Sequence, residues 1–254
     1  MLQIHQFPCL DDNYGFLVHD PATGATATID TPDADEILRQ ARAKRWTITD
    51  IWNTHWHPDH AGGNAAIKAA TGALVTGPAE VARIGQAPDR IVVEGDAPRL
   101  GETGARVLDV GGHTLGHIAY VFDADGVAFV GDALFALGCG RLFEGTPQQM
   151  WGSLQKIATL PGATTLYCAH EYTQSNARFA ASVDPENEAL AARVVEIDRL
   201  RAAGKPTVPM TLSKEQATNP FLRAPALKHR LNMANADDWE AFAELRKRKD
   251  TFKG

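Results

Sequence analysis

The stretch Thr54-His55-Trp56-His57-Pro58-Asp59-His60 places three imidazoles and one carboxylate within seven residues. Neutral imidazole is the commonest side-chain metal ligand, and with carboxylate it suits zinc, iron or manganese. His55 and His57 alternate, so an extended backbone turns both rings to one side. Asp59 and His60 follow a proline that turns the chain, so they can serve a second position close by. A solvated polar loop explains one histidine but not this density, and the stretch therefore predicts a metal site.

The composition sets the class of protein. With 254 residues, the chain is long enough for one large domain or for one medium and one small domain. Its hydrophobic share of 44% and charged share of 22% are those of an ordinary globular protein. A formal net charge of −6 argues against nucleic-acid or anionic-membrane partners, because both need a broad positive surface.

Cysteine usage and the N-terminal residues bear on the compartment. Cys9, Cys139 and Cys168 are far apart and form no C-x-x-C pair, so neither a disulfide framework nor a structural zinc ribbon is indicated. A small and odd number of cysteines is typical of proteins in a reducing compartment. Residues 1–5 lack the basic start of a signal peptide, and no apolar stretch reaches the ~18 residues of a membrane span. We expect a cytoplasmic protein.

Four predicted strands each end at a histidine or an aspartate. The strand over 48–53 leads into the histidine-rich stretch, and the strand over 106–110 leads into Gly111-Gly112-His113-Thr114-Leu115-Gly116-His117. The strand over 127–130 runs into Gly131-Asp132, and the strand over 164–168 ends at His170. Loops on a rigid sheet scaffold usually carry function, so we expect these side chains to act together.

The helices are predicted from their start signals and periodicity. The segment 33–43 has helical spacing. Thr146-Pro147-Gln148-Gln149 combines an N-cap, an N1 proline and a capping glutamine, which predicts a helix to about Leu160. Helical periodicity over 186–203 and 236–249, with few strand signals after about Tyr172, indicates a helical second domain.

The order of these motifs is H-x-H-x-D-H, G-H-T-x-G-H, G-D and C-A-H-E-Y, and it resembles the metallo-β-lactamase superfamily. The resemblance implies an α+β fold, an αββα sandwich of two sheets between helices with the metals at one edge. We expect a metallo-β-lactamase-like catalytic domain over residues 1–173, followed by a small all-α domain over residues 174–254.

The resemblance also implies a ligand set for two divalent metal ions, zinc first, with iron or manganese accepted by the same ligands. One ion would be held by His55, His57 and His113, and the other by Asp59, His60 and His170. Asp132 would bridge the two ions. For His117 we expect a supporting or packing role instead.

Further blocks look like glyoxalase II, the hydroxyacylglutathione hydrolase family. They lie at residues 10–14, 138–145, 170–173, 219–223 and 245–253, so the resemblance covers nearly the whole chain. It implies hydrolysis of S-(2-hydroxyacyl)glutathione, typically S-D-lactoylglutathione, to D-lactate and glutathione, a step of methylglyoxal degradation. A metal-bridging hydroxide would attack the thioester, with Asp59 and Asp132 as the catalytic carboxylates.

The substrate contacts are likewise implied by the resemblance. They would be made at the positions of Arg141, Phe143, Tyr172, Arg246 and Lys249. Phe143 stands where some relatives have tyrosine, so one hydrogen bond to the tripeptide is absent or replaced. The basic run 246–249 has two interpretations, a solvated helix end or a basic patch that binds the two carboxylates of glutathione. Because the protein is otherwise acidic, the basic patch explains the run better.

The rival functions are distinguished by the metal site. A glutathione persulfide dioxygenase of the same superfamily would use a single iron, whereas this sequence retains a second ligand set. A structural metal site would be closed and would not need a bridging carboxylate. No G-x-S-x-G motif supports a serine hydrolase, and Cys139 and Cys168 fit small packing residues. We expect a monomeric enzyme that acts on a small-molecule substrate.

Overall fold

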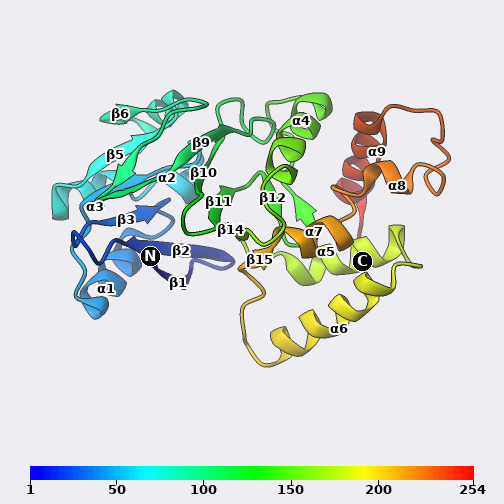
Figure 1. Cartoon of the computed structure of the whole chain (residues 1–254), viewed down its shortest axis with the longest axis horizontal. Coiled ribbons are helices and arrows are strands. Elements are labelled where there is room, and N and C mark those ends of the chain that lie inside the picture. The colour runs from blue at the N-terminus through cyan, green and yellow to red at the C-terminus, as the bar shows by residue number, and fades with distance from the viewer. The chain divides into compact units, whose positions relative to one another are not determined.

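The computed structural model describes all 254 residues, and the chain divides into two compact units. The first unit comprises residues 1–109 and 116–131, and the second comprises residues 110–115 and 132–254. Figure 1 labels the elements, coloured from blue at the N-terminus to red at the C-terminus. Each unit contains both strands and helices.

The larger sheet of the first unit has six strands in the order β1-β2-β3-β4-β5-β6. They are β1 (Gln3–Cys9), β2 (Asn13–His19), β3 (Thr26–Ile29), β4 (Asp50–Trp52), β5 (Leu74–Gly77) and β6 (Arg90–Ile91). Strands β1 to β3 are antiparallel, whereas β3 to β6 run parallel. Because parallel strands end at the same edge, the chain leaves β3 and β4 side by side, where functional loops usually lie.

Helices cover this sheet through a continuous apolar core. The predicted helix over 33–43 is confirmed as α1 (Ala34–Lys44), capped by the Asp33 side chain, which accepts a hydrogen bond from the Glu36 backbone N–H. The buried face of α1 carries Ile37, which belongs to one apolar cluster with Ile51 of β4 and with Ile67 of α3 (Asn64–Thr71). The shorter elements are α2 (Pro58–Ala61), the 3-10 helix η1 (Ala79–Ile84), β7 (Arg99–Leu100) and β8 (Thr103–Gly104).

A second set of strands in the first unit forms an antiparallel ladder. These are β9 (Arg106–Asp109), β10 (Ile118–Phe122) and β11 (Val127–Gly131), with β10 between the other two. A tight hairpin at residues 123–126 joins β10 to β11, since Phe122 pairs with Val127 across the turn. Every residue of β10 and β11 is buried. Such strands are covered on both faces.

The two sets of strands in the first unit face one another through aromatic side chains. Trp52 of β4 stacks on Phe122 of β10 with ring centroids 5.7 Å apart. The Tyr120 hydroxyl of β10 donates a hydrogen bond to the Asn53 carbonyl at 2.9 Å, directly before the histidine-rich stretch. This packing makes β10 a rigid support for that stretch.

The second unit is mainly helical. Its helices are α4 (Pro147–Ala158), α5 (Thr173–Val183), α6 (Glu188–Ala202), α7 (Leu212–Thr218), α8 (Ala224–Leu227) and α9 (Asp238–Thr251). Its strands β12 (Leu134–Phe135) and β13 (Gly138–Cys139) form one pair, and β14 (Thr165–Cys168) and β15 (Met210–Thr211) form another. The predicted start of α4 is confirmed, because the Thr146 hydroxyl accepts from the Gln149 backbone N–H at 3.2 Å. Helices α6 and α9 confirm those predicted over 186–203 and 236–249.

The helices of the second unit share cores that cross the predicted domain boundary. Leu137, which lies before the predicted boundary, belongs to one apolar cluster with Ala177 of α5 and Leu190 of α6. Trp151 of α4, in the part assigned to the catalytic domain, lies against Phe242 of α9 with ring centroids 6.0 Å apart. The boundary after residue 173 stays a prediction.

No helix in the structure has both the length and the apolar character that a membrane span requires.

Candidate metal centre

The histidine-rich stretch begins where β4 ends. His57 is the N-cap of the short helix α2, and Pro58 occupies its first turn, where a missing N–H costs nothing. His55 and His60 are buried, whereas 38% of the Asp59 side chain is exposed. His55 Nε2 lies 3.0 Å from His57 Nδ1. The local fold therefore gathers the predicted ligands of this stretch instead of leaving them in solvent.

Asp30, directly after β3, holds two of these imidazoles in place. Its carboxylate accepts hydrogen bonds from the Thr54 backbone N–H at 2.8 Å, the Thr54 hydroxyl at 2.8 Å and His60 Nδ1 at 2.9 Å. Since the Thr54 hydroxyl donates to Asp30, it accepts from His55 Nδ1 at 3.1 Å. Both rings thus carry the proton on Nδ1 and present the Nε2 lone pair as a ligand atom.

Sequence reasoning missed Asp30. It is buried and has a φ of +59°, a conformation that Asp and Asn adopt more readily than most residues. The available signal was an acidic residue immediately after the fully buried strand β3.

The second unit contains Asp132, His113 and His170. One Asp132 oxygen, Oδ2, lies 3.3 Å from His113 Nε2, and the other, Oδ1, lies 3.3 Å from His170 Nε2. His113 Nδ1 donates to the Arg141 carbonyl at 2.8 Å, which leaves Nε2 as its ligand atom. His170 is stacked on Tyr172 with ring centroids 4.7 Å apart. The carboxylate thus presents one oxygen to each imidazole, as a bridging ligand would.

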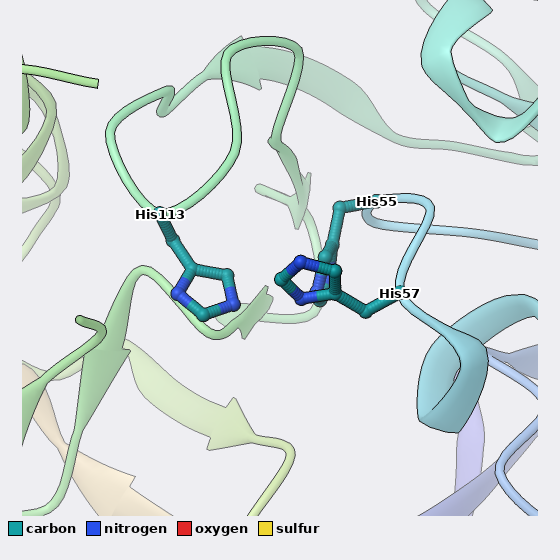
Figure 2. Close-up of side chains that lie close together, drawn as sticks. All are labelled: His55, His57 and His113. Carbon is teal, nitrogen blue, oxygen red and sulfur yellow. The ribbon is translucent and has the colours of Figure 1, made fainter. Parts of the chain in front are cut away.

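Candidate ligand atoms lie within 4.8 Å of one another in three groups. The groups are His55, His57 and His113; His55, His60 and Asp132; and Asp59, His60 and His170. Figure 2 draws the first group. Imidazoles whose Nδ1 is already engaged, together with carboxylates, are a donor set that fits divalent metal ions.

His117 lies beside this donor set. It is fully buried, and its ring stacks on His55 with centroids 4.5 Å apart and an interplanar angle of 21°. This contact packs the imidazole of His55 from one side. The expectation that His117 packs instead of binding metal stays a prediction.

The predicted substrate contacts differ in their accessibility. Arg141, Phe143 and Tyr172 are exposed. Arg246 is 5% exposed, and its guanidinium donates to the Cys139 carbonyl at 2.9 Å and to Asp250 Oδ1 at 2.9 Å. The structure therefore commits much of Arg246 to bonds inside the protein.

Lys249, one turn from Arg246 on α9, is half-buried. Its ammonium donates to the carbonyl and the hydroxyl of Ser175, both at 3.1 Å. Its pKa falls to about 8, first through burial and then through the nearby guanidinium groups of Arg246, Arg178 and Arg141. Sequence reasoning missed Arg178, which is exposed on α5. These four residues form a cationic cluster in which Asp250 is the counter-charge that raises the Lys249 pKa.

The cysteines are all buried thiols. Burial raises the pKa of Cys139 to about 11 and that of Cys168 to about 12. Burial also raises the pKa of Cys9 to about 12. A thiol with such a pKa carries little thiolate near neutrality, so none of the three is suited to be a nucleophile.

Two family models and full-length relatives match this chain. Residues 15–170 match the metallo-beta-lactamase superfamily, and residues 171–252 match the hydroxyacylglutathione hydrolase C-terminus. A hydroxyacylglutathione hydrolase of Erythrobacter litoralis (strain HTCC2594) is 59% identical over 99% of this chain and 100% of the relative. Another, of Maricaulis maris (strain MCS10), is 56% identical over 99% of each chain.

Among solved structures, ETHE1 from Myxococcus xanthus superposes with a TM-score of 0.67 over 97% of each chain. The two sequences are 24% identical, so this match supports a shared fold and nothing further. The matches confirm the expected α+β fold, a metallo-β-lactamase domain followed by a helical domain. The chain therefore belongs to the metallo-β-lactamase superfamily and, within it, to the hydroxyacylglutathione hydrolases.

Proposed function

We propose that this protein hydrolyses S-(2-hydroxyacyl)glutathione, typically S-D-lactoylglutathione, to D-lactate and glutathione. The observation that carries the proposal is Asp132, whose two oxygens each lie 3.3 Å from a different imidazole, that of His113 and that of His170. A carboxylate arranged in this way suits a pair of ions better than a single one. The names of full-length relatives favour this reading over a persulfide dioxygenase with one iron.

The proposed site would hold two divalent ions. Zinc is the metal we expect, and iron and manganese are compatible with the same ligands. His55, His57 and His113 would hold one ion, and Asp59, His60 and His170 the other, with Asp132 shared between them. When bound, such a pair lowers the pKa of water and polarises a carbonyl. The groupings of ligand atoms within 4.8 Å support this assignment.

The chain's own side chains orient the reactants. Asp59, the partly exposed carboxylate of the set, would accept a hydrogen bond from the attacking water and so orient it. Water adds its oxygen to the thioester carbon, the carbon–sulfur bond breaks, and the sulfur leaves with the bonding electrons. A thiol of pKa about 8.5 leaves as the thiolate, so no general acid is needed. Of the two protons of the water, one is then taken up by the thiolate to give glutathione, and the other is released as D-lactate ionises.

The glutathione moiety would bind at the cationic cluster Arg141, Arg178, Arg246 and Lys249. Burial, and then the neighbouring guanidinium groups, lower the pKa of Lys249, and the two carboxylates of the tripeptide would complement this excess of positive charge. Phe143, 63% exposed and 5.2 Å from the His113 ring, and Tyr172 would border the same moiety.

We assign the chemistry to a domain over residues 1–173 and glutathione binding to a helical domain over residues 174–254. The separate family matches to residues 15–170 and 171–252 support this division. A cytoplasmic location is supported by three free, buried cysteines. The monomeric state stays a prediction.

One assay tests the proposal. Purified protein is given S-D-lactoylglutathione, the loss of thioester absorbance is followed, and the metal content of the same sample is measured. We expect turnover that increases with metal content up to two ions per chain. Full activity at one ion per chain, or oxygen consumption with glutathione persulfide in place of thioester hydrolysis, would contradict it.

A further inference from the structure

Asp59 differs from the buried histidines of the proposed ligand set. Its side chain is 38% exposed, against 1% for His60. It lies in the first turn of α2, a helix of four residues. An exposed carboxylate samples several rotamers, and fixing it in one of them costs conformational entropy when an ion binds. A metal-binding Asp in this position therefore needs a group that holds it.

Asn13 is positioned to do this. Its side-chain Nδ2 lies 3.2 Å from Asp59 Oδ2 and 3.3 Å from the Asp59 carbonyl oxygen. An amide nitrogen carries two hydrogens, so both bonds form at once and tie the carboxylate to its own backbone. Asn13 itself is only 6% exposed and is fixed in the β1–β2 hairpin, where it pairs with Cys9.

The oxygen that Asn13 fixes is the one that matters for the ligand set. Asp59 Oδ2 also lies 3.5 Å from His60 Nε2, the ligand atom that Asp30 directs by engaging His60 Nδ1. A carboxylate oxygen has two acceptor sites, so it can accept from Asn13 and still offer a lone pair to an ion. Asn13 thus serves Asp59 as Asp30 serves His60.

An ordinary turn role explains Asn13 less well. Asparagine is common in turns because its side chain bonds to the backbone two residues on. Here both side-chain hydrogen bonds of Nδ2 reach across 46 residues to Asp59. The hairpin turn itself has its left-handed residue at Leu10, with a φ of +47°.

We infer that Asn13 is a positioning residue for Asp59 and controls the affinity of one of the two metal positions, that of Asp59, His60 and His170. The inference rests on the proposed two-metal function. It assigns no contact between Asn13 and the substrate, so its loss should lower metal affinity and kcat while KM for the glutathione thioester stays nearly unchanged.

The test is the Asn13→Leu variant, which keeps the shape of the side chain and removes the donor. Two stepwise zinc dissociation constants are measured by competition with a chromophoric chelator, together with Tm. We expect one step to weaken by about 10- to 100-fold while the other keeps its wild-type value. The matched control is Asn176→Leu, another buried asparagine, whose Nδ2 donates to the Ala136 carbonyl at 3.1 Å. It should lower Tm and leave both zinc constants unchanged.

Two outcomes overturn the inference. The first is an Asn13→Leu protein with both wild-type zinc constants. The second is an equal weakening of both steps with a loss of Tm like that of Asn176→Leu, which would mean a general structural role. Wild-type protein that binds a single zinc ion would instead refute the two-metal function, and the inference with it.

Discussion

The ligand stretch at residues 54–60 and the cationic end of α9 hold their charged groups in opposite ways. In the ligand stretch, His60 Nδ1 bonds directly to the Asp30 carboxylate. His55 Nδ1 bonds to the Thr54 hydroxyl, which in turn donates to Asp30. At the end of α9, burial and then the neighbouring guanidinium groups lower the pKa of Lys249 to about 8. The first arrangement fixes lone pairs for a metal, whereas the second gathers four cations around the single counter-charge of Asp250 and leaves an excess of positive charge for an anionic ligand.

The difference teaches how the proposed chemistry and recognition can be separated. Groups that position a metal act at the reacting centre, so their loss should appear in kcat. Groups that hold the glutathione moiety act equally on ground and transition states, so their loss should appear in KM. Substitutions in the two regions test whether the separation holds.

The largest effect is expected for Asp132→Ala. Removing a carboxylate that faces two imidazoles should lower kcat by about 10²-fold or more, because the metal pair loses its shared ligand. Steady-state kinetics with S-D-lactoylglutathione measures this, and circular dichroism checks that the fold is kept. Near-normal turnover would remove Asp132 from the site.

Asp30→Asn tests the support behind the ligands. Asparagine keeps the size and tolerates the φ of +59°, but its amide has only one acceptor oxygen. It therefore cannot accept from the Thr54 backbone N–H at one oxygen and from the Thr54 hydroxyl and His60 Nδ1 at the other, as the Asp30 carboxylate does. We expect zinc affinity to fall by about 10- to 100-fold with little change in KM. Chelator competition measures the affinity. An unchanged affinity would show that the imidazoles hold their orientation without Asp30.

Lys249→Ala tests the cationic end of α9. A charge-assisted hydrogen bond is worth roughly 1.5 to 3 kcal/mol, less where solvent screens it, so KM should rise by about 5- to 50-fold with kcat nearly constant. High salt should reduce the difference. A small neutral thioester without the tripeptide is the control substrate and should show no difference between the variant and wild type. A change in kcat alone would contradict the proposed separation.

The smallest effect is a pH dependence. A lysine is cationic below its pKa, and that of Lys249 is about 8, so its positive charge is present at pH 7 and lost above pH 8. We therefore expect kcat/KM for the glutathione thioester to decline as the pH rises through 8. In Lys249→Arg the charge persists to high pH, and this decline should disappear. The same decline in both proteins would assign it to another group.

The sequence revealed the ligands more readily than the groups that orient them. Three histidines and an aspartate in seven residues are rare enough to indicate a metal site by themselves. Asp30 and Asn13 are single polar residues at a strand end and in a turn, where such residues are common for local reasons. Their partners are 24 and 46 residues away, and only the fold shows those contacts.

The burial of individual charged side chains could not be predicted from the sequence either. The basic run 246–249 reads as one charged segment, yet in the structure Arg246 is 5% exposed and Lys249 is half-buried, while Lys247 and Arg248 are exposed. The short strands β5 and β6, of four and two residues, were not predicted from the sequence either.

The burial of the thiols has a consequence for a protein that would release glutathione at every turnover. A mixed disulfide between glutathione and a protein requires an accessible cysteine with some thiolate character. Cys139 lies close to the proposed glutathione-binding residues, since its carbonyl accepts from Arg246, yet its own pKa is about 11 through burial. Burial of all three cysteines thus disfavours exchange with glutathione disulfide, and the activity should persist when the glutathione around the protein becomes oxidised.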